Sequence, residues 1–181
     1  MIIEKLKIVN FKLYDKESKI FNFHEDLNII VGNNDTGKST ILDALQLVTT
    51  GKINGVYAER ALSMNLFNMK AQREFSDSLD SKEIILPEII IEIFGKKDDR
   101  YADLSGTNNT LGEDCPGMQV KIEFDETYET EYRDRVSKKE ITQIPIDYYK
   151  ISKHYFSGDT IEFRKTPFKT VEWQPFFKQL L

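Results

Sequence analysis

The chain has 181 residues, 40% of them hydrophobic and 30% charged, with five prolines and nine glycines, which excludes a disordered or fibrous protein. A chain of this length forms one globular domain, or one lobe of a larger one. The net charge of −5 excludes attraction of nucleic acid or anionic lipid by the overall field of the protein, so we expect any DNA contact to be local or to lie outside this chain.

The cysteine content and the apolar runs indicate a reducing, cytoplasmic setting. Cys115 is the single cysteine, so no internal disulfide can form, and residues 1–10 mix charges among their apolar side chains, unlike a signal peptide. The most apolar run, residues 83–94, is interrupted by a proline and glutamates and is far shorter than the roughly 20 residues of a spanning helix. We therefore expect a cytoplasmic protein that does not contact a membrane.

In chain order, the hydrophobic pattern first predicts three strands and a helix. Residues 2–11 and 20–23 predict strands, and the continuous apolar run LNIIV, residues 27–31, predicts a strand that is buried on both faces. Residues 37–50 carry apolar side chains at helical spacing, and Gly51 follows as a C-terminal cap. The predicted order is therefore strand, glycine-rich loop, helix.

The middle of the chain gives weaker signals. Residues 52–81 predict a loop and a helix, with helical patterning around residues 58–69. Strands are predicted at residues 88–94 and 118–124. The connection between them, residues 95–117, is rich in Gly, Asn and Asp, so we do not expect it to belong to the core.

Two further elements are predicted towards the C-terminus. Residues 126–136 predict an amphipathic surface helix, in which Glu129 and Glu131 each precede an arginine by four residues, the favourable orientation for an ion pair. Residues 148–156 and 160–165 predict a β-hairpin around an SGD turn.

The sequence IIVGNNDTGKST, residues 29–40, contains the pattern G-x-x-x-x-G-K-[ST] without deviation. Glycines let the backbone wrap closely around a polyphosphate, so that main-chain N–H groups point inward and the helix N-terminus adds its partial positive charge. We therefore expect this P-loop to bind ATP with Mg²⁺. The residues predicted to bind the nucleotide are Gly32, Asn33, Asn34, Asp35, Thr36, Gly37, Lys38, Ser39 and Thr40.

Three of these side chains have specific predicted roles. Lys38 is the predicted catalytic residue and would neutralise the β- and γ-phosphates, Ser39 would bind Mg²⁺ through its hydroxyl, and Thr40 would reach the α-phosphate. A chance match is expected in on the order of one chain in a hundred of this length, and the flanking elements make chance a poorer explanation still.

The first fifty residues resemble the ATP-binding-cassette (ABC)-type heads of RecF, SMC and Rad50 proteins. The resemblance rests on the P-loop and on IVNFK, residues 8–12, a strand end followed by a basic residue; the form VGNNDTGKST departs mildly from the usual pattern. It implies an α/β fold of the P-loop NTPase class, namely the N-terminal lobe of an ABC-type head with a mixed β-sheet and a P-loop helix. It also implies that Lys12 approaches the nucleotide, although an ordinary exposed lysine explains this residue equally well.

Segments in the middle of the chain resemble the N-terminal ATPase segment of OLD-family ATP-dependent endonucleases, a group used in bacterial anti-phage systems. These segments are LPEIIIEIF, LSGTNN, CPGMQVKIEFDETYETEY and IPIDYYKI. The family implies an ATPase that forms a homodimer or higher homo-oligomer through its heads, followed by a Toprim nuclease domain. Residues 1–181 would then be an incomplete ATPase lobe, and DNA would be bound by regions outside it.

Two segments imitate the remaining parts of a cassette ATPase. LSGTN at residues 104–108 is similar to a signature segment, and KIEFDE, which ends at Asp125 and Glu126, is similar to a Walker B strand. We reject both, because the glycines and proline that follow would break a signature helix, and because residues 120–126 alternate as a half-exposed strand does. We therefore predict negligible ATP hydrolysis by this chain alone.

Other polar and aromatic residues favour ordinary structural roles. His24 and His154 lack partners at metal-ligand spacing, and Asp98 and Asp99 are most simply a solvated turn. No N-K-x-D segment follows the P-loop, which disfavours a GTPase. DNA contact is not the simplest explanation of the basic residues, which are typical surface charges: Lys138, Lys139, Arg164, Lys165 and Lys169. Sheet packing is the simpler explanation of the aromatic residues: Tyr148, Tyr149, Tyr155 and Phe156.

Two alternatives to the endonuclease reading remain open. One is a DNA-repair or chromosome-maintenance ATPase of RecF, SMC or Rad50 type without nuclease activity. The other is a module that does not hydrolyse ATP and in which the nucleotide only controls dimerisation.

Overall fold

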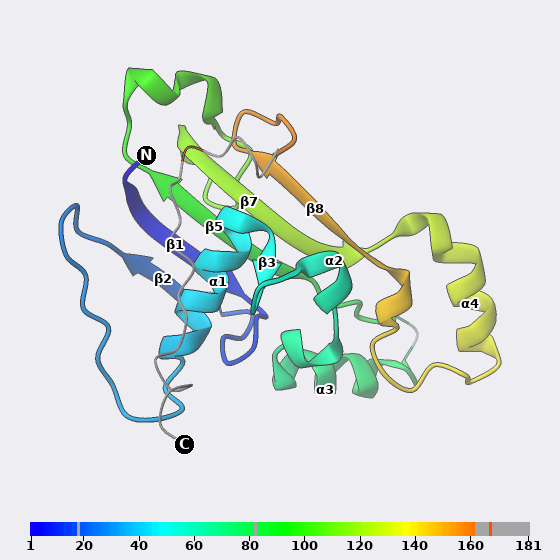
Figure 1. The fold of residues 1–181 in the computed structure, drawn as a ribbon. Helices are drawn as coiled ribbons and strands as arrows, with labels where there is room; N and C mark the ends of the chain where they lie inside the picture. The colour runs from blue at the N-terminus through cyan, green and yellow to red at the C-terminus, as the bar shows by residue number, and fades with distance from the viewer. Residues whose placement is uncertain (18, 82, 162–166, 168–181) are drawn as a thin grey trace.

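The computed structural model describes residues 1–17, 19–81, 83–161 and 167 (Figure 1). An antiparallel sheet forms its centre, with strand order β2-β1-β5-β7-β6 and with β8 paired to the remaining part of β7. Its strands are β1 Ile3–Val9, β2 Lys19–Asn22, β5 Ile89–Gly95, β6 Ser105–Gly106, β7 Cys115–Phe124 and β8 Tyr149–Tyr155. The other elements are α1 Lys38–Thr50, a small hairpin of β3 Lys52–Ile53 and β4 Val56–Tyr57, α2 Ala58–Ala61, α3 Met69–Ser78, α4 Glu129–Ser137, and the 3-10 turns η1 Met64–Leu66, η2 Asp99–Leu104, η3 Glu126–Tyr128 and η4 Ile146–Tyr148.

The hydrophobic core lies between one face of the sheet and helix α1, which crosses that face in Figure 1. Strands β1, β5 and β7 place every second side chain on this face, as the period of two in a strand requires. Helix α1 contributes Ala44 together with Leu47 and Val48, which follow it by three and four residues, and all three are fully buried. The strand residues of this core include Leu6, Ile8, Ile89, Ile91, Ile93, Met118, Val120 and Ile122.

Helix α1 confirms the helix that was predicted after the glycine-rich loop. Gly37 precedes it with φ 93°, and Gly51 ends it with φ 71°, so both flanking positions take the left-handed conformation that glycine adopts without strain. The backbone N–H of Gly51 donates to the carbonyl of Leu47 at 2.8 Å, as a C-terminal cap does.

The strand predicted at residues 27–31 is wrong. These residues form no strand, and Leu27, Ile29 and Val31 are 71%, 74% and 83% exposed. A buried strand needs neighbours on both sides, and no described strand pairs with this segment. The expected mixed sheet is therefore antiparallel in all its described pairings.

The helical patterning predicted around residues 58–69 is confirmed only in part. Helix α2 and the 3-10 turn η1 lie within this range, and the longer helix α3 follows at Met69–Ser78. The side chain of Asn68 accepts the N–H of Lys70 at 2.8 Å and so caps the helix, while Ala71 and Phe75, four residues apart, are buried. A polar capping residue and a single apolar pair fix this helix.

The connection between β5 and β7 is part of the folded core, contrary to the prediction. Cys115 is buried with Phe94 and Phe156, and Leu111 packs against them. Thr110 donates its backbone N–H at 2.8 Å to Glu92, a carboxylate that is 0% exposed in the middle of β5, and its hydroxyl bonds the same carboxylate. The connection therefore folds back over the second face of the sheet.

The last two predicted elements are present with changes. Arg133 pairs with Glu129 as expected, but Glu131 accepts a hydrogen bond from the Tyr148 hydroxyl at 2.6 Å in place of its predicted arginine partner. Strand β8 forms, and a bridge from His154 to Thr160 begins the predicted hairpin. Residues 162–165 of that hairpin lie outside the described residues.

No helix in the described part of the chain is both long and apolar enough to traverse a lipid bilayer.

Gly117 gives a direct test of the packing behind β7. A Cβ at this position would overlap the Phe156 ring and lie 2.6 Å from the Ile93 carbonyl oxygen. We expect Gly117→Ala to lower the free energy of unfolding by about 3 kcal/mol in urea titrations, because a packed interior resists added volume. The control is Gly55→Ala, where the space is open and only the positive φ costs about 1 kcal/mol. Equal losses at the two positions would contradict this packing.

Candidate functional site

The P-loop residues form an exposed turn that leads directly into α1. Gly32 to Thr36 are exposed, and Gly37 is buried where the loop meets the helix. No side chain caps the first turn of α1, so its free N–H groups remain available to an anion. The chain thus presents a helix N-terminus at the end of a glycine-bounded turn, as the sequence predicted.

Lys38 folds back over the loop that precedes it. Its ammonium group donates to the carbonyl oxygen of Gly32 at 2.7 Å and also to that of Asn33. The hydroxyl of Thr36 donates to the same Asn33 carbonyl at 2.9 Å. These bonds hold a positive charge at the turn, next to the N-terminus of α1.

Packing restricts one position of this turn, and backbone conformation restricts another. A Cβ at Gly32 would come 2.7 Å from the Thr36 hydroxyl oxygen, so a larger residue would displace that side chain. Asp35 has φ 62°, in the left-handed region, which Asp tolerates better than most residues. Asn34 lies beside it and is exposed.

The two hydroxyl residues at the start of α1 lie in different surroundings. Ser39 is exposed, which suits a side chain that would reach a metal ion outside the protein surface. Thr40 is only 5% exposed, so its predicted contact with the α-phosphate has less room. Both follow Lys38 directly and so stay within the first helical turn.

Lys12 lies against the P-loop helix and not against the loop itself. Its ammonium group forms an ion pair with Asp43 of α1 at 2.5 Å and lies 5.4 Å from the centre of the Phe11 ring. Its backbone N–H donates to Leu66 at 2.8 Å. The basic residue of the IVNFK segment therefore ties the first strand to α1.

Tyr14 is a residue at this site that the sequence analysis missed. It lines a cavity of about 760 Å³ beside the P-loop together with Phe21, Thr36, Lys38 and Ile41. Its hydroxyl donates to the carbonyl oxygen of Gly37 at 3.2 Å. The only sequence signal was its position two residues after Lys12.

The other residues considered from the sequence do not gather into a second site. His154 contacts the side-chain oxygen of Gln119 at 3.0 Å within the sheet, and His24 is exposed outside any helix or strand. Hydrogen bonds from Arg100 lower the pKa of Asp98 to about 2, so Asp98 is a paired turn residue. Among the described residues no three His, Cys, Asp or Glu side chains are grouped to hold a metal ion.

The basic and aromatic residues for which DNA contact was the less simple explanation have ordinary structural roles where the structure describes them. Lys138 pairs with Asp134 at 2.6 Å on the surface of α4, and Lys139 follows in the turn. Four aromatic residues are buried as predicted: Tyr148, Tyr149, Tyr155 and Phe156. The basic residues Arg164, Lys165 and Lys169 lie outside the described part of the chain.

The two segments that imitate cassette motifs have other structural roles. Leu104 ends a 3-10 turn, and Ser105–Gly106 then pairs with β7 as strand β6. Asp125 follows β7 and caps η3 by accepting the N–H of Thr127 at 3.1 Å. The P-loop belongs to no strand of the described sheets, so neither segment pairs with it.

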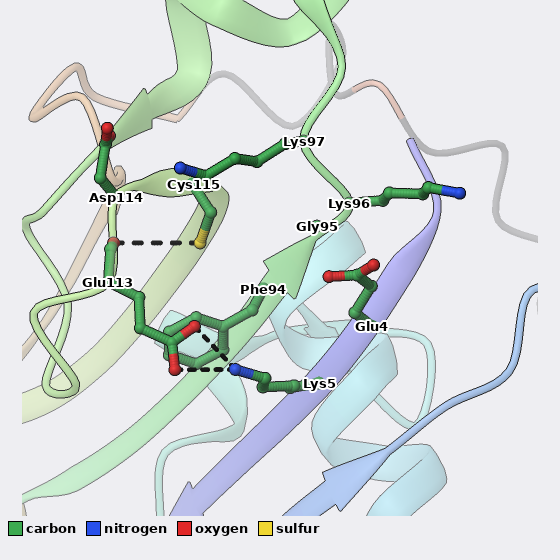
Figure 2. Close-up of a pocket in the computed structure, with 9 residues that line it drawn as sticks. All are labelled: Glu4, Lys5, Phe94, Gly95, Lys96, Lys97, Glu113, Asp114 and Cys115. Atoms are coloured by element: carbon green, nitrogen blue, oxygen red, sulfur yellow. Dashed lines mark hydrogen bonds and ion pairs between the residues drawn. The ribbon is translucent and has the colours of Figure 1, made fainter.

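A second cavity, of about 550 Å³, lies between β1, β5 and the connection before β7 (Figure 2). Lys5 reaches both carboxylate oxygens of Glu113 at 2.7 Å, and Lys96 pairs with Glu25. Burial raises the pKa of the Cys115 thiol, which keeps it protonated and unreactive. Paired charges and an inert thiol make this cavity a poor candidate for catalysis.

Comparisons with known proteins identify the family of this chain and relatives of parts of it. The family model described as AAA domain matches residues 5–170. The DNA replication and repair protein RecF of Alkaliphilus oremlandii is 35% identical over 52 residues, which are 29% of this chain and 14% of that protein. The DNA double-strand break repair Rad50 ATPase of Thermoplasma acidophilum is 35% identical over 75 residues, 41% of this chain and 8% of that protein.

A solved structure from work on the ATP-driven dimerization and DNA-stimulated activation of SMC ATPases is also similar. It has a TM-score of 0.48 and 17% sequence identity, over 91% of this chain and 74% of that chain. This likeness is too distant to bear on function. The matches to RecF and Rad50 span only a small part of those proteins' lengths.

Proposed function

We propose that this chain, which belongs to the AAA domain family, binds ATP and Mg²⁺ as the N-terminal lobe of an ABC-type ATPase. It is an α/β P-loop ATPase domain related to RecF and Rad50. The observation that carries the proposal is the turn from Gly32 to Gly37, with the Lys38 ammonium group above it and the uncapped start of α1 behind it. A positive side chain and free N–H groups at one point match a polyphosphate.

In this proposal each P-loop side chain has one task. Lys38 leaves the carbonyls of Gly32 and Asn33 to bind the β- and γ-phosphates, since a phosphate is a stronger partner for an ammonium group than a neutral carbonyl. Ser39 supplies a hydroxyl to Mg²⁺. Lys12 stabilises α1 through Asp43 and acts on the nucleotide only indirectly.

We also propose that residues 1–181 are an incomplete ATPase domain, whose Walker B, signature and nuclease parts lie elsewhere. The support is the exposed apolar segment 27–31, directly before the P-loop. Three uncovered aliphatic side chains in one short segment are a costly surface for a finished domain. Further strands paired to this segment would bury it.

The parent protein that we propose is an OLD-family ATP-dependent DNA endonuclease with a role in anti-phage defence. Its support is the resemblance of the middle segments. The 35% identity to parts of RecF and Rad50 favours the alternative, a DNA-repair ATPase without nuclease activity. A Toprim pattern downstream in the parent gene would favour the endonuclease, and a long coiled coil would favour Rad50.

The proposed partners follow from the interpretation of the chain as part of an ABC-type ATPase. We propose a cytoplasmic homodimer or higher homo-oligomer that is formed through ATPase heads, with DNA bound by regions outside this chain. If ATP only controls dimerisation, sedimentation velocity will show ATP-dependent association and phosphate release will stay at background.

We expect this chain alone to bind ATP with Mg²⁺ in calorimetry and to show no turnover in a phosphate-release assay. The physical reason is that the proposed lobe lacks the Walker B glutamate that would orient an attacking water, and the hydrogen bonds that the Lys38 ammonium group makes in the structure go to carbonyl oxygens. The same preparation serves for both measurements, so binding acts as the control for folding. Turnover at an enzyme's rate that Lys38→Ala abolishes would contradict the expectation.

A further inference from the structure

The phenol of Tyr14 lies at the point where the P-loop becomes helix α1. Its hydroxyl donates a hydrogen bond to the carbonyl oxygen of Gly37, with 3.2 Å between the two oxygens. The same carbonyl accepts the backbone N–H of Ile41 at 3.1 Å, the first hydrogen bond of the helix. Two donors from outside the loop therefore hold this one carbonyl.

The Gly37 carbonyl belongs to the peptide unit whose N–H is that of Lys38. A trans peptide is planar, so its C=O and N–H point in opposite directions, and fixing one fixes the other. Gly37 has φ 93° and ψ 9°, a left-handed conformation from which glycine can rotate easily. The Lys38 N–H is a free donor at the start of α1, and any rotation of this peptide plane would turn it away from the direction that it has in the structure.

Tyr14 is itself held in place, so it can restrain Gly37. Its ring makes an edge contact with Phe21, with the ring centres 5.3 Å apart, and its backbone N–H donates to Phe11 at 2.9 Å. Burial raises the pKa of the Tyr14 phenol, so the hydroxyl stays protonated and can donate at neutral pH. A Cβ at Gly37 would come 2.6 Å from the hydroxyl oxygen, which shows how closely the two residues approach.

We propose that Tyr14 is a positioning residue for phosphate binding, because its hydroxyl fixes the Gly37–Lys38 peptide with the Lys38 N–H directed at the phosphates. This inference rests on the proposed function and adds a residue outside the P-loop to it. The ligand that Tyr14 influences is the polyphosphate and not the base. Tyr14 should therefore raise the affinity of the chain for any ligand that carries a triphosphate group.

The test is the Tyr14→Phe variant of the full chain, which keeps the ring and its contact with Phe21 and removes only the hydroxyl. We expect the Kd for ATP with Mg²⁺, measured by calorimetry, to rise about threefold to tenfold, the effect of one hydrogen bond. The Kd for inorganic tripolyphosphate with Mg²⁺ should rise by the same factor. A rise for ATP alone would mean that Tyr14 contacts the base, which would overturn the proposal.

The matched control is Tyr149→Phe, which also removes a hydroxyl that donates to a backbone carbonyl. Tyr149 donates to Pro87 at 2.9 Å in a buried position away from the P-loop. We expect this variant to lower the urea midpoint while its Kd for ATP stays within about twofold of the unmodified chain.

Two results would overturn the inference about Tyr14 alone. One is an unmodified chain that binds ATP and a Tyr14→Phe variant that binds it equally tightly. The other is an equal loss of affinity in Tyr149→Phe, which would trace the effect to stability. If the unmodified chain takes up neither ATP nor tripolyphosphate, the proposed function fails, and this inference fails with it.

Discussion

Replacing Lys38 by alanine is expected to raise the Kd for ATP with Mg²⁺ about a hundredfold or more. The ammonium group would otherwise make charge-assisted hydrogen bonds to two phosphates, each contributing about 1.5–3 kcal/mol. The free energy of unfolding should change by no more than about 0.5 kcal/mol, because the present partners of Lys38 are carbonyls of an exposed turn. Calorimetry and urea titration measure the two quantities on one preparation.

The matched control for this variant is Lys138→Ala. Lys138 is a surface lysine whose ammonium group pairs with Asp134 at 2.6 Å, far along the chain from the P-loop. It should leave the Kd for ATP unchanged. If Lys38→Ala binds ATP as tightly as the Lys138→Ala control, the site is not the P-loop and the proposed function is wrong.

The largest expected loss of stability comes from Glu92→Ala. The Glu92 carboxylate is 0% exposed and accepts the side-chain amide of Gln119, itself buried, at 2.7 Å. It also accepts two donors from Thr110, a residue at the surface. Lys7, directly opposite in the sheet and 8% exposed, donates to the Thr110 hydroxyl at 2.5 Å. Without the carboxylate, the Gln119 amide and the two Thr110 donors lose their acceptor, and the buried Lys7 ammonium group loses the negative charge opposite it in the sheet. We expect the free energy of unfolding to fall by about 3–5 kcal/mol in urea titrations.

Glu113→Ala is the control for that experiment. Glu113 also pairs with a lysine of β1, at 2.7 Å, but its side chain is 41% exposed, so the pair is screened by water. We expect a loss of about 1 kcal/mol or less. Equal losses of unfolding free energy in the two variants would show that the Glu92 carboxylate does not hold a buried hydrogen-bond network in the sheet.

The sequence predicted those elements whose structure is determined by residues within one short segment. Helix α1 has apolar residues at helical spacing and a glycine at each end, so its limits could be predicted nearly to the residue. Strand β5 is dense in isoleucine, and strands β1, β5 and β7 form where the hydrophobic pattern predicted strands, although β7 begins earlier, at Cys115. The P-loop was predictable for the same reason, because one short segment carries the whole turn and the helix start.

The parts that could not be predicted depend on contacts between distant segments. Glu92 looked like an interruption of an apolar strand, and its partner Thr110 lies in a connection whose composition indicates a loop. Tyr14 reaches Gly37 across 23 positions of the chain, and no local pattern reports that distance. The run at residues 27–31 has the pattern of a buried strand, but burial requires neighbours that the described chain does not provide.

The uncovered run at residues 27–31 has a practical consequence for handling the protein. Leu27, Ile29 and Val31 present aliphatic side chains to water on a stretch of backbone that no described strand protects. Such stretches promote intermolecular β-pairing and aggregation when a chain is concentrated. We therefore expect the purified polypeptide to aggregate at high concentration. Light scattering in nucleotide-free buffer gives the baseline against which any ligand-induced assembly must be judged.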